Sequence, residues 1–368
     1  MIAALGRVAP EHRYLVSVPS GLGYEEVVTG IPQHELSTFA GRANLWKRWL
    51  YEQGELKNLL RRFNPDIILA LANKGMAGFD CPQAILCHNP YVWHSRGQYG
   101  PYPSIEMALV CLKVQIQRFF LRRDLNKPHS ILLHQTFTAR DRIRTRFRYS
   151  GPAIHCPNAV SDFSVRSGGG SAVAVPDAVR PYSDRFKMFY VTRYYPHKNI
   201  EAIVETFRRH GSELPDTVVF ITIAADQHPR ARQILRAIEK HGLTDHVVSV
   251  GPLPQEELGG WFSACNALLM PTFLESFSGT YLEAMHFGLP ILTSDLDFAH
   301  EVCQDAARYF DPRDPASIRD AILSLKTDPA ATSDLVERGK KRLQEMSRSW
   351  DDITREVLYH IVAIAETE

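Results

Sequence analysis

The sequence has no apolar run as long as the roughly 18 residues that a membrane-spanning helix needs. It also lacks a Cys-x-x-Cys pair, and its six cysteines stand singly in apolar surroundings, which argues against a zinc site and against a disulfide framework. No basic segment followed by an apolar one opens the chain, so we expect neither a membrane span nor a secretory route. These absences predict a cytoplasmic protein with reduced thiols.

The chain has little net charge, +1 over 368 residues, but the charge is divided unevenly. Residues 1–160 hold 20 Lys and Arg against 11 Asp and Glu, whereas the remainder holds 22 against 30. The first part would therefore favour an anionic partner or surface. Nucleic acid is not expected as that partner, because the basic residues are scattered and form no recognised reader motif.

The length exceeds one typical core and suits two domains. Apolar runs of strand length alternate with amphipathic helical stretches, which predicts an α/β fold with parallel sheets. The first series has strands at 14–19, 67–71, 84–88, 130–134 and 153–156, with helices at 44–63 and 104–123 among them. The second series has strands at 188–191, 217–223, 247–250, 267–270, 290–293 and 307–310, and the chain is helical beyond 315.

A stretch without periodicity and with three consecutive glycines, 166–182, predicts a loop between domains. We expect domains at 1–160 and 161–345, followed by a C-terminal helix at 346–368. The start is unusual, because an apolar helical turn leads straight into the strand at 14–19. In a doubly wound sheet of order 3-2-1-4-5 the central first strand would then be missing, leaving two strand edges unpaired. Either a true start lies upstream or the domain is not standard.

The most informative segment is 270–295, with the sequence MPTFLESFSGTYLEAMHFGLPILTSD. A strand ends at 270, a loop carries Glu275, and a helix beginning near Thr280 carries Glu283. The first amides of this helix lack intrahelical partners, and such a terminus binds a diphosphate readily. Two carboxylates on either side of it can accept hydrogen bonds from hydroxyl pairs, as suits a molecule with a sugar at one end and a ribose at the other. Taken alone, solvated carboxylates near a helix start are an equal alternative.

Two cations, Arg193 and Lys198, follow the strand at 188–191. Side chains at the carboxyl end of a parallel strand face the crevice where α/β sheets bind ligands, and these cations could neutralise a leaving diphosphate. A pair of solvated surface cations is the alternative. One domain thus holds two groups that suit an anionic ligand: the helix start near Thr280 and the two cations. Their occurrence together favours ligand binding over solvated surface charges for both.

In combination these motifs resemble the donor half of the family-4 retaining glycosyltransferases. The resemblance covers 186–310 and rests on Arg193-x4-Lys198, on Glu275-x7-Glu283 and on Gly-Leu-Pro at 288–290. PNAVSD at 157–162 is similar to the family's entry into the interdomain linker, and Trp350 lies in the last helix. The resemblance implies the GT-B fold, in which two Rossmann-like domains face a cleft and a C-terminal helix crosses back to the first domain.

The resemblance also implies roles for particular residues. Arg193 and Lys198 would hold the donor diphosphate, Glu275 would act on the transferred sugar as a catalytic residue, and Glu283 would bind the ribose. Further contacts to the phosphates would come from the backbone amides of Phe277, Ser278, Gly279 and Thr280. Transfer would proceed with retention on the front face, with no metal and no cofactor besides the nucleotide-sugar donor. Two glycines of the family pattern are replaced here, by Thr192 and Ser278.

The first domain offers His88, at the end of the strand at 84–88. A His at this position contacts the sugar in related enzymes, and a histidine satisfied by nearby backbone is the alternative. Two helices that mix apolar and basic residues, 44–62 and 106–127, suggest a peripheral contact with an anionic membrane surface. The alternative is a core-facing helix with solvated charges.

We therefore expect a retaining, metal-independent glycosyltransferase of hexosyltransferase type. It would use a UDP- or GDP-linked sugar and a carbohydrate or lipid-linked acceptor, in polysaccharide or glycoconjugate biosynthesis. Two alternatives are a nucleotide-sugar epimerase of GT-B fold and an inactive partner protein that binds the donor. The donor's base and sugar, the acceptor and the linkage are not specified by the sequence.

Overall fold

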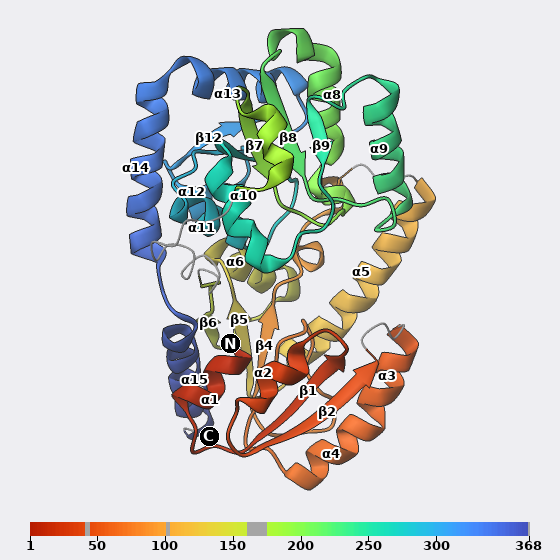
Figure 1. Cartoon of the computed structure of the whole chain (residues 1–368). Helices are drawn as coiled ribbons and strands as arrows, with labels where there is room; N and C mark the ends of the chain where they lie inside the picture. Colours follow the sequence, from red (N-terminus) through yellow and green to blue (C-terminus); the bar gives the residue numbers. More distant parts are fainter. Residues whose placement is uncertain (41–44, 101–103, 160–174, 367–368) are drawn as a thin grey trace. The chain divides into compact units, whose positions relative to one another are not determined.

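The computed structural model describes residues 1–40, 45–100, 104–159 and 175–366, which divide into two compact units (Figure 1). The first unit comprises residues 1–88, 115–159 and 348–368, and the second comprises 89–114 and 160–347. The segment 89–114, which the sequence placed in the first domain, thus groups with the second unit. The expected boundary at 160, the glycines at 168–170 and the end of the PNAVSD motif lie outside the described residues.

The second unit is built on one sheet of six strands in the order β12-β11-β10-β7-β8-β9. Every neighbouring pair is parallel. All residues of β8, β10 and β11 are buried, as expected for strands covered on both faces. The strands are β7 (Phe186–Tyr190), β8 (Thr217–Ile221), β9 (Val247–Ser249), β10 (Ala267–Met270), β11 (Ile291–Ser294) and β12 (Ala307–Phe310).

Helices alternate with these strands, as the sequence predicts. Three of them begin with proline behind a side-chain cap, a favourable start because proline lacks the amide that would stay unpaired there. Helix α8 packs against α9 and α13, and α11 packs against α14. The helices are α8 (Ile200–His210), α9 (Pro229–Lys240), α10 (Leu258–Ala264), α11 (Gly279–His286), α12 (Asp297–Cys303), α13 (Pro315–Thr327) and α14 (Pro329–Met346).

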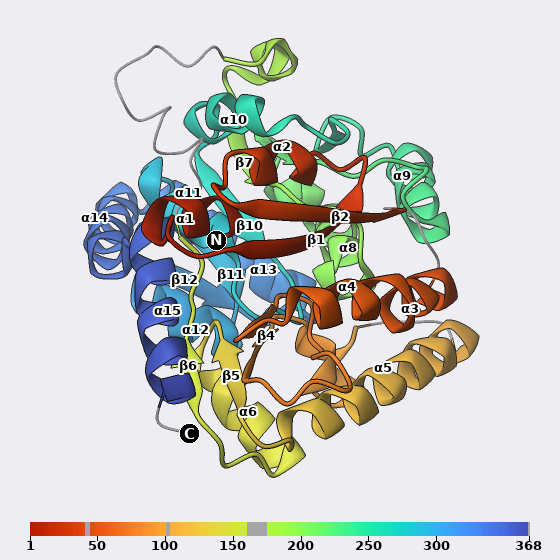
Figure 2. The same ribbon diagram turned by 90° about the horizontal axis from the view of Figure 1, so that it is seen from below.

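The first unit contains a parallel sheet β3-β4-β5-β6 and a separate parallel pair β1-β2. Figure 2 shows the pair β1-β2 apart from β4, β5 and β6. The strands are β1 (Tyr14–Ser20), β2 (His34–Ala40), β3 (Ile68–Ala70), β4 (Gln83–Cys87), β5 (Ser130–His134) and β6 (Ala153–His155).

The helix expected over 44–63 is two helices, α3 (Leu45–Gln53) and α4 (Glu55–Phe63), which meet at Gly54. Glycine departs from helical geometry more easily than other residues, because it has no β-carbon to restrict its backbone. The other helices of this unit are α1 (Ile2–Val8), α2 (Tyr24–Thr29), α6 (Phe137–Phe147) and α15 (Trp350–Glu366). Helix α5 (Ser104–Leu125) begins in the second unit and ends in the first. Among the described residues, no helix is long and apolar enough to cross a membrane.

The last helix, α15, packs on the sheet of the first unit. Its buried residues Ile353, Val357 and Ile361 form one cluster with Ala84, Ile131, Leu133 and Ile154 from β4, β5 and β6. Arg7 on α1 pairs with Asp351 at the start of α15, with nitrogen and oxygen 2.5 Å apart. The chain therefore returns to its first unit, as the GT-B resemblance predicts.

Candidate functional site

The order of the second sheet reverses between β7 and β10. These neighbours are parallel, so the loops that follow them leave the same edge of the sheet. From β7 the chain continues toward β8 on one side, and from β10 it continues toward β11 on the other. The two loops therefore diverge, and a crevice outside the carboxyl ends of the strands is where such sheets bind ligands. Arg193 and Lys198 follow β7, and Glu275 follows β10.

Asn199 ties the two loops together. Its side-chain amide donates to the carbonyls of Pro271 after β10, at 2.9 Å, and Pro312 after β12, at 2.8 Å. The residue is buried and has a φ of 54°, in the left-handed region that asparagine tolerates better than most residues. This conformation also lets the backbone turn into α8 directly behind Lys198.

A second set of hydrogen bonds joins the same loops. The carbonyl of His197 accepts from the backbone amide of Phe273 at 2.7 Å and from the hydroxyl of Thr272 at 3.0 Å. The hydroxyl of Tyr190, at the end of β7, donates to the carbonyl of Lys198 at 2.9 Å. The backbone on both sides of the Lys198 side chain is thereby fixed.

This scaffold brings Lys198 and Glu275 into direct contact. The Nζ of Lys198 forms an ion pair with Oε1 of Glu275, and the side chains are only 17% and 12% exposed. The hydroxyl of Thr272 approaches the same carboxylate oxygen at 3.4 Å. Burial raises the pKa of Tyr190 well above its usual value, and the negative charge of Glu275 adds to the effect. A cation and a carboxylate from two strand ends thus meet at the reversal of the sheet.

Arg193 lies on the same loop as Lys198 but is exposed. It makes no ion pair with any residue that the structure describes. Thr192 stands where the resembled family has glycine, and Thr222 fixes its backbone. The backbone amide of Thr192 donates to the hydroxyl of Thr222 at 2.7 Å. The hydroxyl of Thr192 in turn donates to the carbonyl of Arg193 at 3.0 Å. The guanidinium is therefore available to an anionic ligand.

Helix α11 begins at Gly279, directly after the loop that carries Glu275. Phe277 and Ser278 are buried, and Ser278 as the capping residue forms no side-chain cap. The first amides of a helix have no intrahelical partner, and a β-carbon added at Gly279 would meet no atom within 4 Å. The start of α11 therefore has open space beside Gly279. Glu283 lies one turn further along α11 and is partly buried.

His88 follows β4 in the first unit. Its backbone amide donates to the side-chain oxygen of Asn73 at 2.7 Å, and the Asn73 nitrogen lies 3.3 Å from the ring Nε2. The ring is thus oriented by Asn73, which the sequence reasoning did not single out. His88 and the donor residues belong to different units, so the role expected for His88 stays a prediction.

The segment 89–114 also supports the loop at 193–198, and the sequence analysis missed it. The hydroxyl of Tyr91 lies 2.6 Å from Nδ1 of the buried His197, whose pKa burial lowers well below its usual value. Tyr99 packs with Phe273 and Leu274 beside Glu275. No periodicity in 89–103 signals this contact, because its partners stand more than 100 positions away.

One Asp-x-Asp triplet, Asp295-Leu296-Asp297, lies after β11, and the sequence reasoning overlooked it. Asp295 is engaged by His300, with oxygen and ring nitrogen 2.5 Å apart. In the described ranges, no three His, Cys, Asp or Glu side chains are grouped so as to hold a metal ion.

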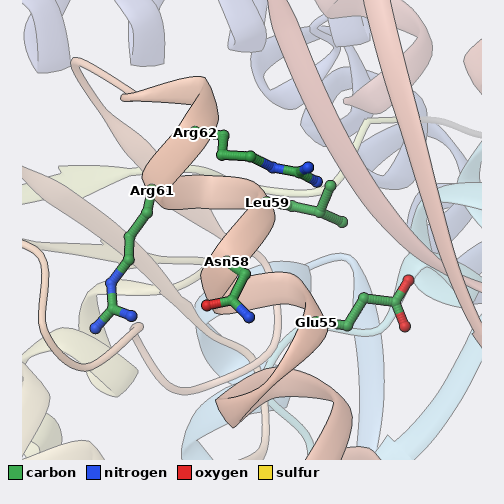
Figure 3. A pocket seen from close by; sticks show the side chains of 5 residues that line it. All are labelled: Glu55, Asn58, Leu59, Arg61 and Arg62. Carbon is green, nitrogen blue, oxygen red and sulfur yellow. The ribbon is translucent and has the colours of Figure 1, made fainter.

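A hollow in the first unit contains none of the expected donor residues (Figure 3). It is lined by Glu55, Asn58, Leu59, Arg61 and Arg62, all from α4. Figure 3 shows Arg61 and Arg62 pointing to different sides of the helix, so their charges do not converge on one ligand.

Comparisons with known proteins match the second unit to a family. Residues 175–342, which include the candidate donor residues of the second unit, match the family described as glycosyl transferases group 1. The serotype-specific mannosyltransferase WbdA of Escherichia coli is 29% identical over 136 residues, 37% of this chain and 17% of the relative. The O-antigen chain mannosyltransferase B of Escherichia coli is 24% identical over 299 residues, 75% of each chain. The chain thus matches about a sixth of the former and three quarters of the latter.

Solved structures share the fold. A glycosyltransferase from Rickettsia africae ESF-5 superposes with a TM-score of 0.73 at 10% identity, covering 100% of this chain and 94% of the other. HepE of Anabaena, solved in complex with UDP, gives 0.69 at 14% identity and covers 98% and 95%. The chain therefore has the GT-B fold. Residues 175–342 of the second unit match the glycosyl transferases group 1 family, and the finer assignment to family 4 stays a prediction.

Proposed function

We propose that the protein is a retaining glycosyltransferase that takes a sugar from a UDP- or GDP-linked donor. The observation that carries the proposal is the contact of Lys198 with Glu275 where the sheet order reverses, next to the start of α11. A nucleotide sugar needs a cationic or amide-lined place for its diphosphate and a carboxylate within reach of its sugar hydroxyls. This edge of the second unit offers both.

In the proposed complex, Lys198 and Arg193 neutralise the diphosphate, together with the amides of residues 277–280. Glu275 accepts hydrogen bonds from the hydroxyls of the transferred sugar, and Glu283 accepts those of the ribose. Charges held in place before the reaction stabilise the negative charge that grows on the leaving phosphate. An added metal ion is not required by this arrangement, which is itself part of the proposal.

The proposed reaction breaks the bond between the anomeric carbon and the diphosphate oxygen. The acceptor hydroxyl forms the new glycosidic bond on the same face, and its proton passes to the departing phosphate. His88, oriented by Asn73, would contact the sugar from the first unit. Configuration at the anomeric carbon is thereby retained without a protein nucleophile.

The relatives support the class of substrate. Two mannosyltransferases, one of them named for the O-antigen chain, match the sequence, and HepE is described in complex with UDP. We propose a carbohydrate or glycolipid acceptor, in polysaccharide or glycoconjugate biosynthesis. We also propose that the protein works in the cytoplasm and contacts the membrane peripherally through its basic first part.

A thermal-shift panel of UDP, GDP, ADP and their common sugars tests the donor site. A ligand that binds only the folded state raises the melting temperature, so UDP or GDP and their sugars should give the largest increase. Lys198→Ala should abolish the shift, because a charged contact to phosphate contributes about 1.5–3 kcal/mol, a loss of roughly ten- to a hundredfold in affinity. Lys341→Ala, an exposed lysine on α14, is the matched control and should keep the shift. No shift with any nucleotide would refute the donor site.

Measuring the turnover of the donor distinguishes three functions: a glycosyltransferase, an epimerase and an inactive donor-binding partner. Enzyme-dependent transfer, or slow hydrolysis of the nucleotide sugar, should be lost in Glu275→Ala while nucleotide binding persists. Formation of a 2-epimer of the donor would instead establish an epimerase. Binding with neither reaction would establish an inactive donor-binding partner.

A further inference from the structure

An aromatic side chain, Tyr195, stands between the two cations that are proposed to hold the diphosphate. Burial alternates along this part of the loop: Arg193 is exposed, Tyr194 is buried, and Tyr195 is exposed by 48%. The backbone of Tyr195 is extended. Successive side chains of an extended chain point to opposite sides, so Arg193 and Tyr195 leave the loop on the same side.

The ring of Tyr195 is backed by the ring of His197. The two rings are stacked, with centroids 5.5 Å apart and an angle of 20° between their planes. His197 is 8% exposed, and burial together with the neighbouring charge of Lys198 lowers its pKa well below the usual value, which keeps the imidazole neutral. The hydroxyl of Tyr91 lies 2.6 Å from Nδ1 of His197 and fixes the plane of that ring. Tyr195 therefore rests on a flat, uncharged and fixed support.

Tyr91 is itself held in place by Tyr99. Their rings meet edge to face with centroids 4.9 Å apart, and the Tyr99 hydroxyl donates to the carbonyl of Tyr91 at 2.9 Å. Tyr99 is 1% exposed. A row of aromatic side chains within the second unit thus runs from a buried tyrosine to the exposed Tyr195. A ligand that stacks on Tyr195 would meet a ring whose freedom is already restricted, so little side-chain entropy is left to lose.

The chemistry of the exposed ring face indicates what it binds. Among the residues that the structure describes, no ring other than that of His197 and no Arg or Lys side chain stacks on Tyr195. The face of an aromatic ring is apolar and slightly negative, so it attracts apolar groups with a slight positive charge and gains nothing from a phosphate. One side of a pyranose ring presents C–H groups of this kind. A sugar ring therefore fits this face better than the diphosphate does.

The proposed reaction places the acceptor near Tyr195. The acceptor hydroxyl attacks on the face from which the diphosphate leaves, so the acceptor has to lie beside the diphosphate. The loop that holds the diphosphate therefore borders the acceptor as well. The nucleobase, by contrast, lies beyond the ribose, and the residue proposed for the ribose is Glu283 on the separate helix α11.

We propose that Tyr195 stacks on a pyranose ring of the acceptor and thereby makes the protein selective for saccharide acceptors. The inference rests on the proposed function, because the place of the acceptor follows from the retaining reaction. It assigns Tyr195 to recognition of the acceptor alone. Binding of the nucleotide is therefore expected to be independent of this side chain.

Saturation-transfer NMR with simple pyranosides tests the proposal. The probes are the methyl α-pyranosides of mannose, glucose, galactose and N-acetylglucosamine, and glycerol serves as a hydroxyl compound without a ring. Each probe is titrated against the full chain in the presence of UDP and GDP. At least one pyranoside should bind the wild-type protein and receive saturation at its ring C–H protons, whereas glycerol should not bind.

Variants of Tyr195 distinguish stacking from simple apolar contact. Tyr195→Leu should raise the Kd of the tightest-binding pyranoside about three- to tenfold, as expected for the loss of an aromatic contact, whereas Tyr195→Phe should change it less than about twofold. Tyr359→Leu replaces a tyrosine that is 71% exposed on α15, and this matched control should bind like the wild type. Because both tyrosines are exposed, all three variants should melt like the wild type and keep its nucleotide-induced thermal shift.

Three outcomes overturn the proposal. The first is that none of the pyranosides binds the wild-type protein, and the second is that Tyr195→Leu binds them equally well. The third is that Tyr195→Leu loses the nucleotide-induced thermal shift, which would assign the ring to the base of the donor. Failure of the proposed function is distinguishable, because the wild type would then gain no thermal shift from any nucleotide while pyranoside binding still depended on Tyr195.

Discussion

Lys198 and Glu275 show how a binding residue is held before its ligand arrives. Both side chains are largely buried, and a buried charge without a partner is costly, so the contact between the two opposite charges offsets part of the cost of burying each. Asn199 fixes the backbone behind Lys198 through two carbonyls from separate strand ends. A diphosphate would therefore meet a cation already in place, with little side-chain entropy left to lose.

His134 gives the first unit a pH dependence of stability. It is 1% exposed, and burial, with His155 stacked nearby as a second cause, lowers its pKa to about 4 from 6.5. Between those values the unfolded chain takes up a proton that the folded chain refuses, so the free energy of unfolding falls as the pH falls from 6.5 toward 4. The full loss is about 3 kcal/mol. Calorimetric melting of the wild type at pH 7.5 and pH 5 should show the decrease.

His134→Gln is the control for that measurement. Its amide can still donate to the carbonyl of Thr136, which His134 Nδ1 approaches at 3.0 Å, but it does not titrate. The variant should lose less stability than the wild type on acidification. His197 in the second unit contributes in the same direction in both proteins, so the difference between them belongs to His134. Equal pH dependence in the two proteins would show that His134 is not the titrating group.

At the scale of elements, the sequence predicted what depends on short-range pattern. Strands such as β5 and β10, each built around an apolar run, were placed to the residue, and the start of α11 was placed within one position. Strand β2 was missed, because its seven residues alternate only weakly between apolar and polar. Ser37 alone among them is buried, and His34 and Phe39 are partly buried. The candidate donor residues were singled out because each lies in a loop after a strand or at the start of the next helix, and their roles stay predictions.

Contacts between distant segments were not predictable in the same way. Tyr91 and His197 are 106 positions apart, and neither local propensity nor periodicity relates them. The packing of 89–114 with the donor loops follows from tertiary structure alone.

Gly100 tests whether the segment 89–114 supports the donor loops. Its φ is +94°, and an added β-carbon would lie 3.0 Å from the backbone oxygen of Pro196, two residues before Lys198. Gly100→Ala should therefore cost about 1–3 kcal/mol of stability and weaken nucleotide binding, because the strain falls on the loop that carries Lys198. Thermal melting with and without UDP or GDP measures both effects.

Gly97→Ala is the matched control for Gly100→Ala. A β-carbon at Gly97 meets no atom within 4 Å, and its φ lies outside the left-handed region. This variant should melt and bind nucleotide like the wild type. If Gly100→Ala behaves in the same way, the contact with Pro196 does not constrain the donor loop.

At the scale of the molecule, the chain closes its first unit with its last helix. Val357 and its neighbours on α15 cover Ala84, Ile131 and Leu133, so this sheet completes its core only when more than 340 residues have been made. The resemblance to GT-B proteins predicted this return, whereas composition and periodicity gave only a terminal helix. The separate pair β1-β2 was not predicted, because β2 was missed.

Val357→Asp tests that dependence. Val357 is 1% exposed, and a carboxylate at this position would be buried without a partner, which should destabilise the first unit by about 3–5 kcal/mol. Among the described residues, the core of the second unit contains none from α15. Scanning calorimetry should therefore show the transition of the first unit at lower temperature, while UDP or GDP still raises that of the second.

Tyr359→Asp places the same charge two residues away on the solvent side of α15, where the side chain is 71% exposed. Surface substitutions of this kind usually change stability by no more than about 0.5 kcal/mol, so its two transitions should match those of the wild type. If Val357→Asp also leaves both transitions unchanged, α15 does not complete the first core. If it instead removes the nucleotide-induced shift, the two units do not unfold separately, and the donor site depends on the first unit for its stability.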